Sequence, residues 1–561
     1  MKLKNILYSM MMGTAVLTGT TSCVSDLDQY PHTETTSKDV YTSLANYEAV
    51  LGKIYAAMVT SGQGKGGDNK DMESVLNKGA GFDYMRMFIN MQECGTDEFA
   101  STWLTGEQTT GLTYLSWDAN DAWVSDMYYR IYYNIALCNE FLRNANNANF
   151  SGADAEKMKE YKAEVRFMRA LFYYHALDFY RNIPMVTEND PVGSYIPPRY
   201  TPQQTFDYIE SELKDCVGDM LPASTCPYGQ ASQGAAYTLL AKLYLNSEVY
   251  TGVAKYAECK EACEKVMNMG YSLESDYSKL FNADNDKRTN EIIFALPVSA
   301  EHTVSWGSST YLVCGQVSMS NANQNVADYG VTAGWSEFRL RPEFVDKFTQ
   351  TDIDGNGDKR CKFFTNGQSK DVTSMTDETA GYLSEKWSNL KDDGTTAASN
   401  TADAGVETDF PLFRLADVYL MYAECVARTV EDKDKLDDWA GGSDAESDSR
   451  KQGAIYWINK VRERAYGKDE NGNPKGQVWK ENFSSKDAFL QFILDERARE
   501  LYHEGYRRTD LIRYGQFTTN KYIWQWKGGT HDGQAVDSKY NIYPIPNTEL
   551  TANPNLHNDN Y

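Results

Sequence analysis

A helical pattern is clearest in Ala163-Glu-Val-Arg-Phe-Met-Arg-Ala-Leu-Phe-Tyr-Tyr-His-Ala-Leu-Asp-Phe-Tyr180. Its apolar side chains recur every three or four residues, which places them on one face of an α-helix. These side chains are Val165, Met168, Phe172, Ala176 and Phe179. Asn182 and Pro184 follow, and such residues are typical of a helix end. The sequence therefore predicts a long helix that buries one face.

The same periodicity returns along the chain, mostly in pairs of segments with short connections. The other helical segments are about 120–145, 202–217, 231–248, 254–269, 411–428, 452–466 and 486–505. These segments mix small and aromatic residues, which suits stacked helix–turn–helix pairs of the tetratricopeptide type. No strict 34-residue period is visible, so we expect a degenerate repeat. The predicted fold class is mainly α, a single domain of such helix pairs with large loop insertions and a few short strands.

The amino-acid composition changes between about residues 270 and 410. Gly, Ser, Asn, Thr and Asp are frequent there, and apolar runs are short. We expect large loops with a few strands, laid over the helical scaffold. Loops on a rigid scaffold are where binding residues tend to lie, so this is the predicted ligand-binding region.

The N-terminus has the pattern of a secretory signal peptide. Lys2 and Lys4 precede an apolar run at 6–17, and small residues lead to Cys23. The run is too short to span a bilayer. We predict a signal peptide over 1–22, lipidation of Cys23 and an extended tether over 23–40, which would put the protein on a membrane surface outside the cytoplasm. Ordinary signal cleavage, with Cys23 incidental, is the alternative.

Composition narrows the choice of ligand. The 561 residues carry 55 basic and 79 acidic side chains, a net charge of −24. Nucleic acid and anionic lipid headgroups are therefore poor partners, because both need basic patches. Aromatic residues make up 13% of the chain, with 39 Tyr and 11 Trp. Aromatic faces suit a ligand that is uncharged and partly apolar.

Motifs of catalysis or metal binding are incomplete. The ten cysteines include no Cys-x-x-Cys pair, so we predict neither a zinc site nor a disulfide framework. Residues 62–67 spell G-x-G-x-x-G without a preceding strand, and residues 352–363 begin like an EF-hand but end in Phe363. The six histidines are scattered, and no G-x-S-x-G is present. The sequence indicates a binding protein and not an enzyme.

Three stretches read together resemble a known family. The first is the segment 163–184, and the second is Asp409-Phe-Pro-Leu-Phe-Arg-Leu-Ala-Asp-Val-Tyr-Leu-Met-Tyr-Ala-Glu424. The third begins with Asp495-Glu-Arg-Ala-Arg-Glu-Leu-Tyr-His-Glu-Gly-Tyr-Arg-Arg-Thr-Asp-Leu-Ile-Arg513. It continues to the C-terminal motifs Tyr543-Pro-Ile-Pro546 and Asn553-Pro-Asn-Leu556. With the cysteine at 23, the three stretches are similar to the SusD/RagB family of Bacteroidetes outer-membrane lipoproteins. The similarity spans the whole chain after residue 22 and is greatest to the starch-binding member of that family.

The resemblance implies a function. Such proteins capture glycan at the cell surface, deliver it to a SusC-like TonB-dependent transporter and do no chemistry. We therefore expect starch or maltooligosaccharide as the ligand and the outer membrane, facing the cell exterior, as the location. A different glycan is the first alternative. A glycan-cleaving enzyme and a pure scaffold protein are alternatives from other classes.

The resemblance also implies binding residues. An aromatic arc that cradles the curve of an α-glucan falls on Trp103, Trp306 and Trp335, and a sugar-binding arginine falls on Arg86. A pyranose has an apolar C–H face that an indole ring can cover, and a helical α-1,4-glucan needs rings along an arc. Tryptophans of the buried core are the alternative reading. A sugar-contacting Asn of the family falls on Gly106, where neighbouring Glu107 or Gln108 would have to substitute.

A calcium site is the last implication of the resemblance. The family's oxygen ligands fall on Asp286, Glu407 and Asp409, with Asn558 from the C-terminal tail. Hard oxygen ligands gathered from distant segments suit Ca²⁺, which would pin loops to the scaffold as a structural ion. A solvated acidic loop is the alternative.

Overall fold

The computed structural model describes residues 37–62, 72, 75–76, 82–399, 405–436 and 453–561. The predicted signal peptide, Cys23 and most of the predicted tether lie outside these residues. The chain divides into a small unit, 1–48, and a large unit, 49–561. In the small unit, residues 37–40 form helix α2 (Ser37–Val40) and not the extended end of a tether. Asp39 lies in the first turn of α2, where a negative charge favours a helix.

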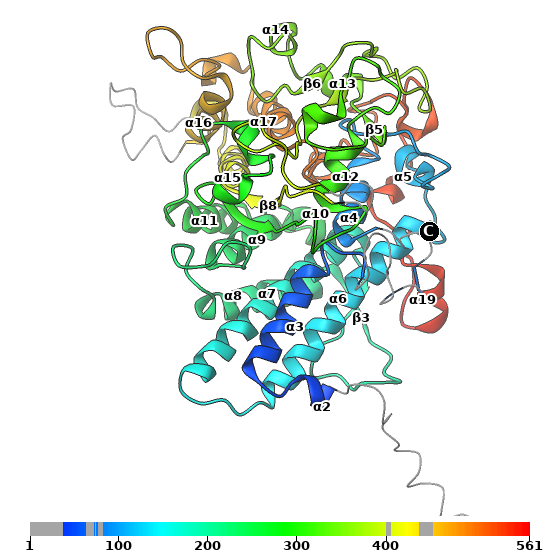
Figure 1. Cartoon of the computed structure of the whole chain (residues 1–561), viewed down its shortest axis with the longest axis vertical. Coiled ribbons are helices and arrows are strands. Elements are labelled where there is room, and N and C mark those ends of the chain that lie inside the picture. Colours follow the sequence, from blue (N-terminus) through cyan, green and yellow to red (C-terminus); the bar gives the residue numbers. More distant parts are fainter. Residues whose placement is uncertain (1–36, 63–71, 73–74, 77–81, 400–404, 437–452) are drawn as a thin grey trace, which may run out of the picture. The chain divides into compact units, whose positions relative to one another are not determined.

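The large unit is built on a succession of long helices (Figure 1). They are α6 (Ala122–Asn146), α7 (Ala153–Tyr180), α8 (Pro202–Cys216), α9 (Gln233–Leu245), α11 (Tyr256–Met267), α15 (Leu415–Thr429), α16 (Ala454–Tyr466) and α17 (Lys486–Leu501). Most of these helices pack on a sequence neighbour: α6 on α7, α7 on α8, α9 on α11, and α15 on α11 and α16, while α17 packs on α15. Packing onto nearest neighbours is the arrangement of helical repeat proteins, as predicted. No helix in the described part of the chain is long and apolar enough to cross a membrane.

Helix α7 shows why the sequence pattern was informative. All five apolar side chains of its predicted face are fully buried. The second half of the helix is buried on its other faces too, because other elements surround it. The chain then leaves the helix through Arg181, whose φ is 64°. Ile183 and Pro184 form strand β2 (Ile183–Pro184), paired with β3 (Arg199–Tyr200).

One predicted helix begins later than expected. Residues 411–414 belong to strand β8 (Phe410–Arg414), which pairs antiparallel with β4 (Ile292–Leu296) before α15 starts. All five residues of β8 are buried, and so are those of β4. When a short segment is buried on every side, its residues are mostly apolar and no polar–apolar periodicity remains. Its sequence then does not show whether it forms a strand or a helix.

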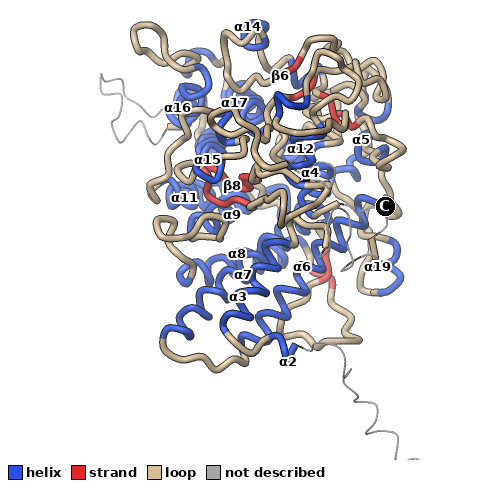
Figure 2. Tube along the Cα trace, viewed as in Figure 1, coloured by secondary structure: helices blue, strands red, loops and turns tan. Residues whose placement is uncertain are grey.

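Loops predominate in the described residues 270–399 and 405–410, as predicted (Figure 2). This region holds β4 and the two-residue strands β5 (Phe338–Arg339), β6 (Phe363–Phe364) and β7 (Leu383–Ser384). Helix α12 (Ser308–Gly315), which was not predicted, lies here with the short α13 (Pro342–Val345) and α14 (Gln350–Ile353). The remaining α-helices and strands described in the large unit are α4 (Tyr84–Glu93), β1 (Ala100–Ser101), α5 (Thr110–Tyr114), α10 (Ser247–Thr251), α18 (Arg507–Arg513) and α19 (Asn547–Ala552). Helix α3 (Leu44–Ala56) begins in the small unit.

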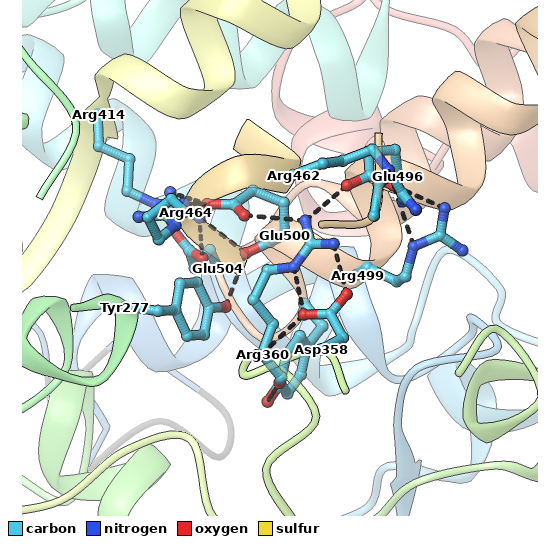
Figure 3. Close-up of polar contacts among 12 residues, drawn as sticks. Tyr277, Asp358, Arg360, Arg414, Arg462, Arg464, Glu496, Arg499, Glu500 and Glu504 are labelled. Atoms are coloured by element: carbon cyan, nitrogen blue, oxygen red, sulfur yellow. Dashed lines mark hydrogen bonds and ion pairs between the residues drawn. The ribbon is translucent and has the colours of Figure 1, made fainter. Parts of the chain in front are cut away.

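A buried ion network fastens these loops to the scaffold (Figure 3). Glu500 of α17 accepts from Arg414 of β8 at 2.6 Å and from Arg360 of the loop region at 3.1 Å. Arg464 of α16 also donates to Glu500. The side chains of Glu500, Arg414 and Arg360 have no solvent exposure. Buried charges are tolerated only when they are paired, so this network fixes where the loops can sit.

Candidate functional site

The three tryptophans predicted to bind ligand lie in loops and not in the core. The side chains of Trp103 and Trp306 are 39% and 42% exposed, and Trp335 is half-buried. By contrast, Trp117, Trp123, Trp387 and Trp524 are fully buried. At this exposure the indole rings of Trp103 and Trp306 have faces open to solvent, where a ligand can stack on them. The core reading is therefore excluded for Trp103 and Trp306.

Backbone hydrogen bonds join the segments that carry these rings. Trp103 follows β1, and β1 pairs with β5, which begins three residues after Trp335. The N–H of Thr102 donates to the carbonyl oxygen of Glu337 over 2.8 Å. The N–H of Trp335 donates to the carbonyl oxygen of Cys314 in α12, also over 2.8 Å. Trp306 lies two residues before α12, so the three segments converge on this helix and strand.

Asp83 shapes the turn that carries Trp306. Its carboxylate caps α4 by accepting from the N–H of Arg86 at 2.8 Å. It also accepts from the Ser305 hydroxyl at 2.6 Å and from the N–H of Ser308 at 3.1 Å. A Cβ at Gly307 would lie 2.2 Å from Asp83 Oδ1, so only glycine fits there. Burial raises the pKa of Asp83, while these donors oppose that shift.

Arg86 lies beneath the site and not on its surface. Its side chain is 3% exposed, and Nη1 donates to the carbonyl oxygen of Trp306 over 2.8 Å. Nη2 lies 3.6 Å from a carboxylate oxygen of Glu107 and 3.6 Å from one of Glu337. The guanidinium carbon sits 4.0 Å from the ring centre of Phe82. Arg86 thus links the loops, and its predicted contact with sugar hydroxyls stays a prediction.

The resemblance places a sugar-contacting Asn of the family at Gly106, in the turn after Trp103. Glu107 and Gln108 are the two neighbouring side chains that could make this contact instead. The side chain of Glu107 is 14% exposed and points toward Arg86. Gln108 is exposed, with φ at 57°. The nearest atom to a Cβ built on Gly106 is Cε3 of Trp103, at an ordinary contact distance of 3.7 Å. Gln108 is therefore the better placed of the two to meet a ligand.

The predicted calcium ligands from the loop region lie near one another. Asp409 accepts from the N–H of Val298 at 2.7 Å and from the Tyr228 hydroxyl at 2.8 Å. Burial raises the pKa of Asp409 to about 6, and the negative charges of Asp286 and Glu407 contribute to the rise. This electrostatic influence places the three acidic side chains in one neighbourhood.

The fourth predicted ligand is bound elsewhere. Asn558 accepts from the N–H of Ile545 at 2.8 Å and donates to its carbonyl oxygen at 3.0 Å. Across the described ranges, no three His, Cys, Asp or Glu side chains are grouped closely enough to hold a metal ion. As placed, the four residues do not form an assembled calcium site, and the ion stays a prediction.

Sequence reasoning did not find all of the residues that build the site. Asp83 and Glu337 are buried polar residues with no motif of their own, although each supports a tryptophan segment. The one available signal was the position of Glu337, two residues after Trp335. Two further tryptophans, Trp524 and Trp526, have structural roles: Trp524 is buried, and Trp526 donates from Nε1 to the carbonyl oxygen of Val372 over 2.7 Å.

Fold and site together define a helical-repeat protein that presents aromatic rings on interconnected loops. Family models agree with this class: residues 355–561 match the model described as SusD family, and residues 27–245 match one described as starch-binding associating with outer membrane. Starch-binding protein SusD of Bacteroides thetaiotaomicron is 32% identical over 99% of this chain and 99% of its own length. The chain belongs to the SusD family.

More distant relatives share the fold. SusD-like protein P25 of Formosa agariphila is 25% identical, with 78% of each chain covered. A solved SusD-like protein of Bacteroides fragilis superposes with a TM-score of 0.67 at 18% identity, covering 95% of this chain and all of its own. Surface glycan-binding protein A of Bacteroides fluxus gives 0.64 at 18% identity, covering 91% and 97%. These structures confirm the mainly α fold.

Proposed function

We propose that this protein binds starch or maltooligosaccharides at the cell surface. The observation that carries the proposal is the exposure of Trp103 and Trp306 on segments joined to that of Trp335. The 32% identity to a starch-binding protein over nearly the whole chain supports this choice of ligand.

The chemistry of the site suits a neutral polysaccharide. Indole rings bury the C–H faces of pyranoses, which supplies apolar area and a directional contact. A helical α-1,4-glucan needs rings set along an arc, and the family resemblance implies such an arc at Trp103, Trp306 and Trp335. The amide of Gln108 offers both a donor and an acceptor for sugar hydroxyls. A net charge of −24 does not oppose such a ligand.

We further propose that the protein binds without catalysis and works on the outer membrane. A lipid on Cys23 would anchor it, and a SusC-like TonB-dependent transporter would receive the glycan. The description of the matched family model, which names an association with the outer membrane, supports the location. Metabolic labelling with a palmitate analogue, compared between the natural chain and Cys23→Ala, tests the anchor. Release of reducing sugar from starch by the pure protein would contradict the absence of catalysis.

A different glycan is the second candidate. Gly106 favours it, because a sugar-contacting Asn is expected at this position from the family resemblance. Affinity for xylan, levan or dextran above that for amylopectin would establish this alternative.

The deciding experiment is calorimetry with maltoheptaose, supported by affinity electrophoresis in amylopectin, on residues 24–561. Trp335→Ala should lose binding. Trp479→Ala is a matched control, since Trp479 is 40% exposed but lies between α16 and α17. Binding by the parent and by Trp479→Ala, with loss in Trp335→Ala, supports the starch site. Equal binding by all three proteins would place the glycan elsewhere.

A further inference from the structure

Glu337 occupies the junction of the three tryptophan segments. It lies two residues after Trp335 and is 1% exposed. Its N–H donates to the carbonyl oxygen of Gly315, and its own carbonyl oxygen accepts from the N–H of Thr102, both over 2.8 Å. The backbone of Glu337 therefore touches the end of α12 and the start of the turn that carries Trp103.

The side chain of Glu337 reaches the third segment through Arg86. Its Oε2 lies 3.6 Å from Arg86 Nη2, and the neighbouring Nη1 holds the carbonyl oxygen of Trp306. The same Nη2 lies 3.6 Å from Glu107, four residues after Trp103. One carboxylate and one guanidinium thus connect loops whose sequence positions are more than 200 residues apart.

The charged surroundings of Glu337 come from several elements. Arg86 of α4 and Arg339 of β5 favour its ionised form, whereas Glu107 of the turn after Trp103 opposes it. Tyr311 of α12 and Cys94, just after α4, also lie within electrostatic reach. Burial is the largest influence and raises the pKa of Glu337 to about 7. The carboxylate therefore changes charge close to neutral pH, where the ion pair with Arg86 forms or is lost.

We infer that Glu337 is a positioning residue of the glycan site, whose carboxylate acts through Arg86 to hold the segments of Trp103, Trp306 and Trp335 in one arrangement. The inference rests on the proposed function and adds a residue that does not itself touch the ligand. It gives the site a pH dependence. Above pH 7 the carboxylate pairs with Arg86; below pH 7 protonation removes its charge, so the segments loosen and the affinity for glucan falls.

Hydrogen–deuterium exchange tests the positioning role without any ligand. Glu337→Gln keeps the size of the side chain but removes its charge. Its control is Glu164→Gln in α7, because Glu164 is equally buried, also has a pKa raised by burial to about 7, and bonds to Tyr55 away from the site. Glu337→Gln should speed exchange about threefold or more in all three of 100–108, 303–310 and 333–340. Exchange that is unchanged, or faster in one segment alone, would overturn the inference.

The pH dependence of maltoheptaose affinity is a second test, because a loss of packing alone would not change that dependence. The natural chain should bind maltoheptaose about fivefold more weakly at pH 6 than at pH 8. Glu337→Gln should bind weakly at both, with a flat profile, whereas Glu164→Gln should keep the natural slope. A flat profile for the natural chain contradicts the inference. Absence of any glucan binding by the natural chain rejects the proposed function, and the exchange experiment then still decides the role of Glu337.

If Glu337→Gln fails to fold, the natural chain itself provides the test. Its exchange in the same three segments, corrected for the intrinsic effect of pH, should rise between pH 8 and pH 6. Segments of α7 and α8 serve as the internal reference. A rise in the reference segments alone, or no rise in the three loops, would overturn the positioning role.

Discussion

Arg86 donates a hydrogen bond from Nη1 to the carbonyl oxygen of Trp306 over 2.8 Å, across 220 positions of sequence. The exposed indole ring of Trp306 is thus carried on backbone that a buried cation holds from below. The guanidinium is itself clamped between the rings of Phe82 and Tyr311, at 4.0 and 4.2 Å from their centres. The position of this exposed ring therefore depends on residues that a ligand at the proposed site need not touch.

Replacing Arg86 should weaken both stability and binding. Arg86→Met keeps the apolar stem between the two rings but leaves Glu107 and Glu337 without their cation. Uncompensated buried carboxylates should lower the free energy of unfolding by about 2–4 kcal/mol, measured by urea denaturation. Maltoheptaose affinity should fall about tenfold in calorimetry. Arg143→Met, which removes a half-buried guanidinium bonded to the backbone of Glu188, is the control and should bind normally.

The presence of an aromatic ring at position 306 should matter more than the size of that ring. Trp306→Tyr should bind maltoheptaose within about threefold of the natural chain, because a phenol ring also stacks on a pyranose. Trp306→Ala should lose about 2 kcal/mol, or roughly 30-fold in Kd, as expected for an aromatic anchor. The melting temperature should hardly change, since the ring is 42% exposed. Equal affinity of all three proteins would remove Trp306 from the binding site.

Gly106 offers a gain-of-function test. A Cβ there meets Trp103 Cε3 only at ordinary contact distance, and Gly106 is not among the residues with positive φ. Gly106→Asn should therefore fold normally and supply a new sugar hydrogen bond, which is worth about 1 kcal/mol or roughly fivefold in affinity. Gly106→Ala is the control for the side chain itself. Tighter binding by both variants, or by neither, would show that the amide makes no sugar contact.

Calcium should stabilise the neighbourhood of Asp286, Glu407 and Asp409, because a cation would neutralise their mutual repulsion. A ligand that binds only the folded chain raises its melting temperature. We expect millimolar CaCl₂ to do so after treatment with EDTA, and Asp286→Asn to abolish the effect. Asn558→Ala should keep it, since Asn558 bonds Ile545 instead. No calcium-dependent shift in the natural chain would remove the predicted ion.

Acid should unfold the protein through its buried carboxylates. Burial alone would raise the pKa of Glu500, but the guanidinium groups of Arg464, Arg414 and Arg360 outweigh it and lower that pKa to about 2. Because the folded-state pKa lies below the unfolded value of about 4.3, the stabilisation is present above that value and is lost as pH falls toward 2. The free energy of unfolding, measured with urea, should decline over this window.

Glu500→Gln tests the source of that decline. It should cost about 3–5 kcal/mol at pH 7, since it leaves Arg414 and Arg360 partly unpaired in the interior. It should also make the loss of stability between pH 4.5 and 2 shallower. Glu258→Gln, a change at an exposed glutamate of α11, should leave both values unchanged. An unaltered slope in Glu500→Gln would assign the acid sensitivity to other carboxylates.

The sequence alone was sufficient for the helical scaffold. Helices such as α7 and α17 repeat their apolar residues at helical spacing, and this local pattern is enough to predict an element and its buried face. It was not sufficient for β8, where Phe410 and its neighbours are buried on all sides and no periodicity survives.

The loop tryptophans could be nominated from the family resemblance and from their polar surroundings, but their support could not. Asp83, Arg86 and Glu337 are charged residues that any sequence rule would place at the surface, yet all three are buried. Their roles arise from partners hundreds of residues away, as in the bond from Arg86 to Trp306. Apolar periodicity relates residues three or four positions apart, so it can be recognised in the sequence. The burial and pairing of a charge depend instead on which distant segments the fold brings beside it.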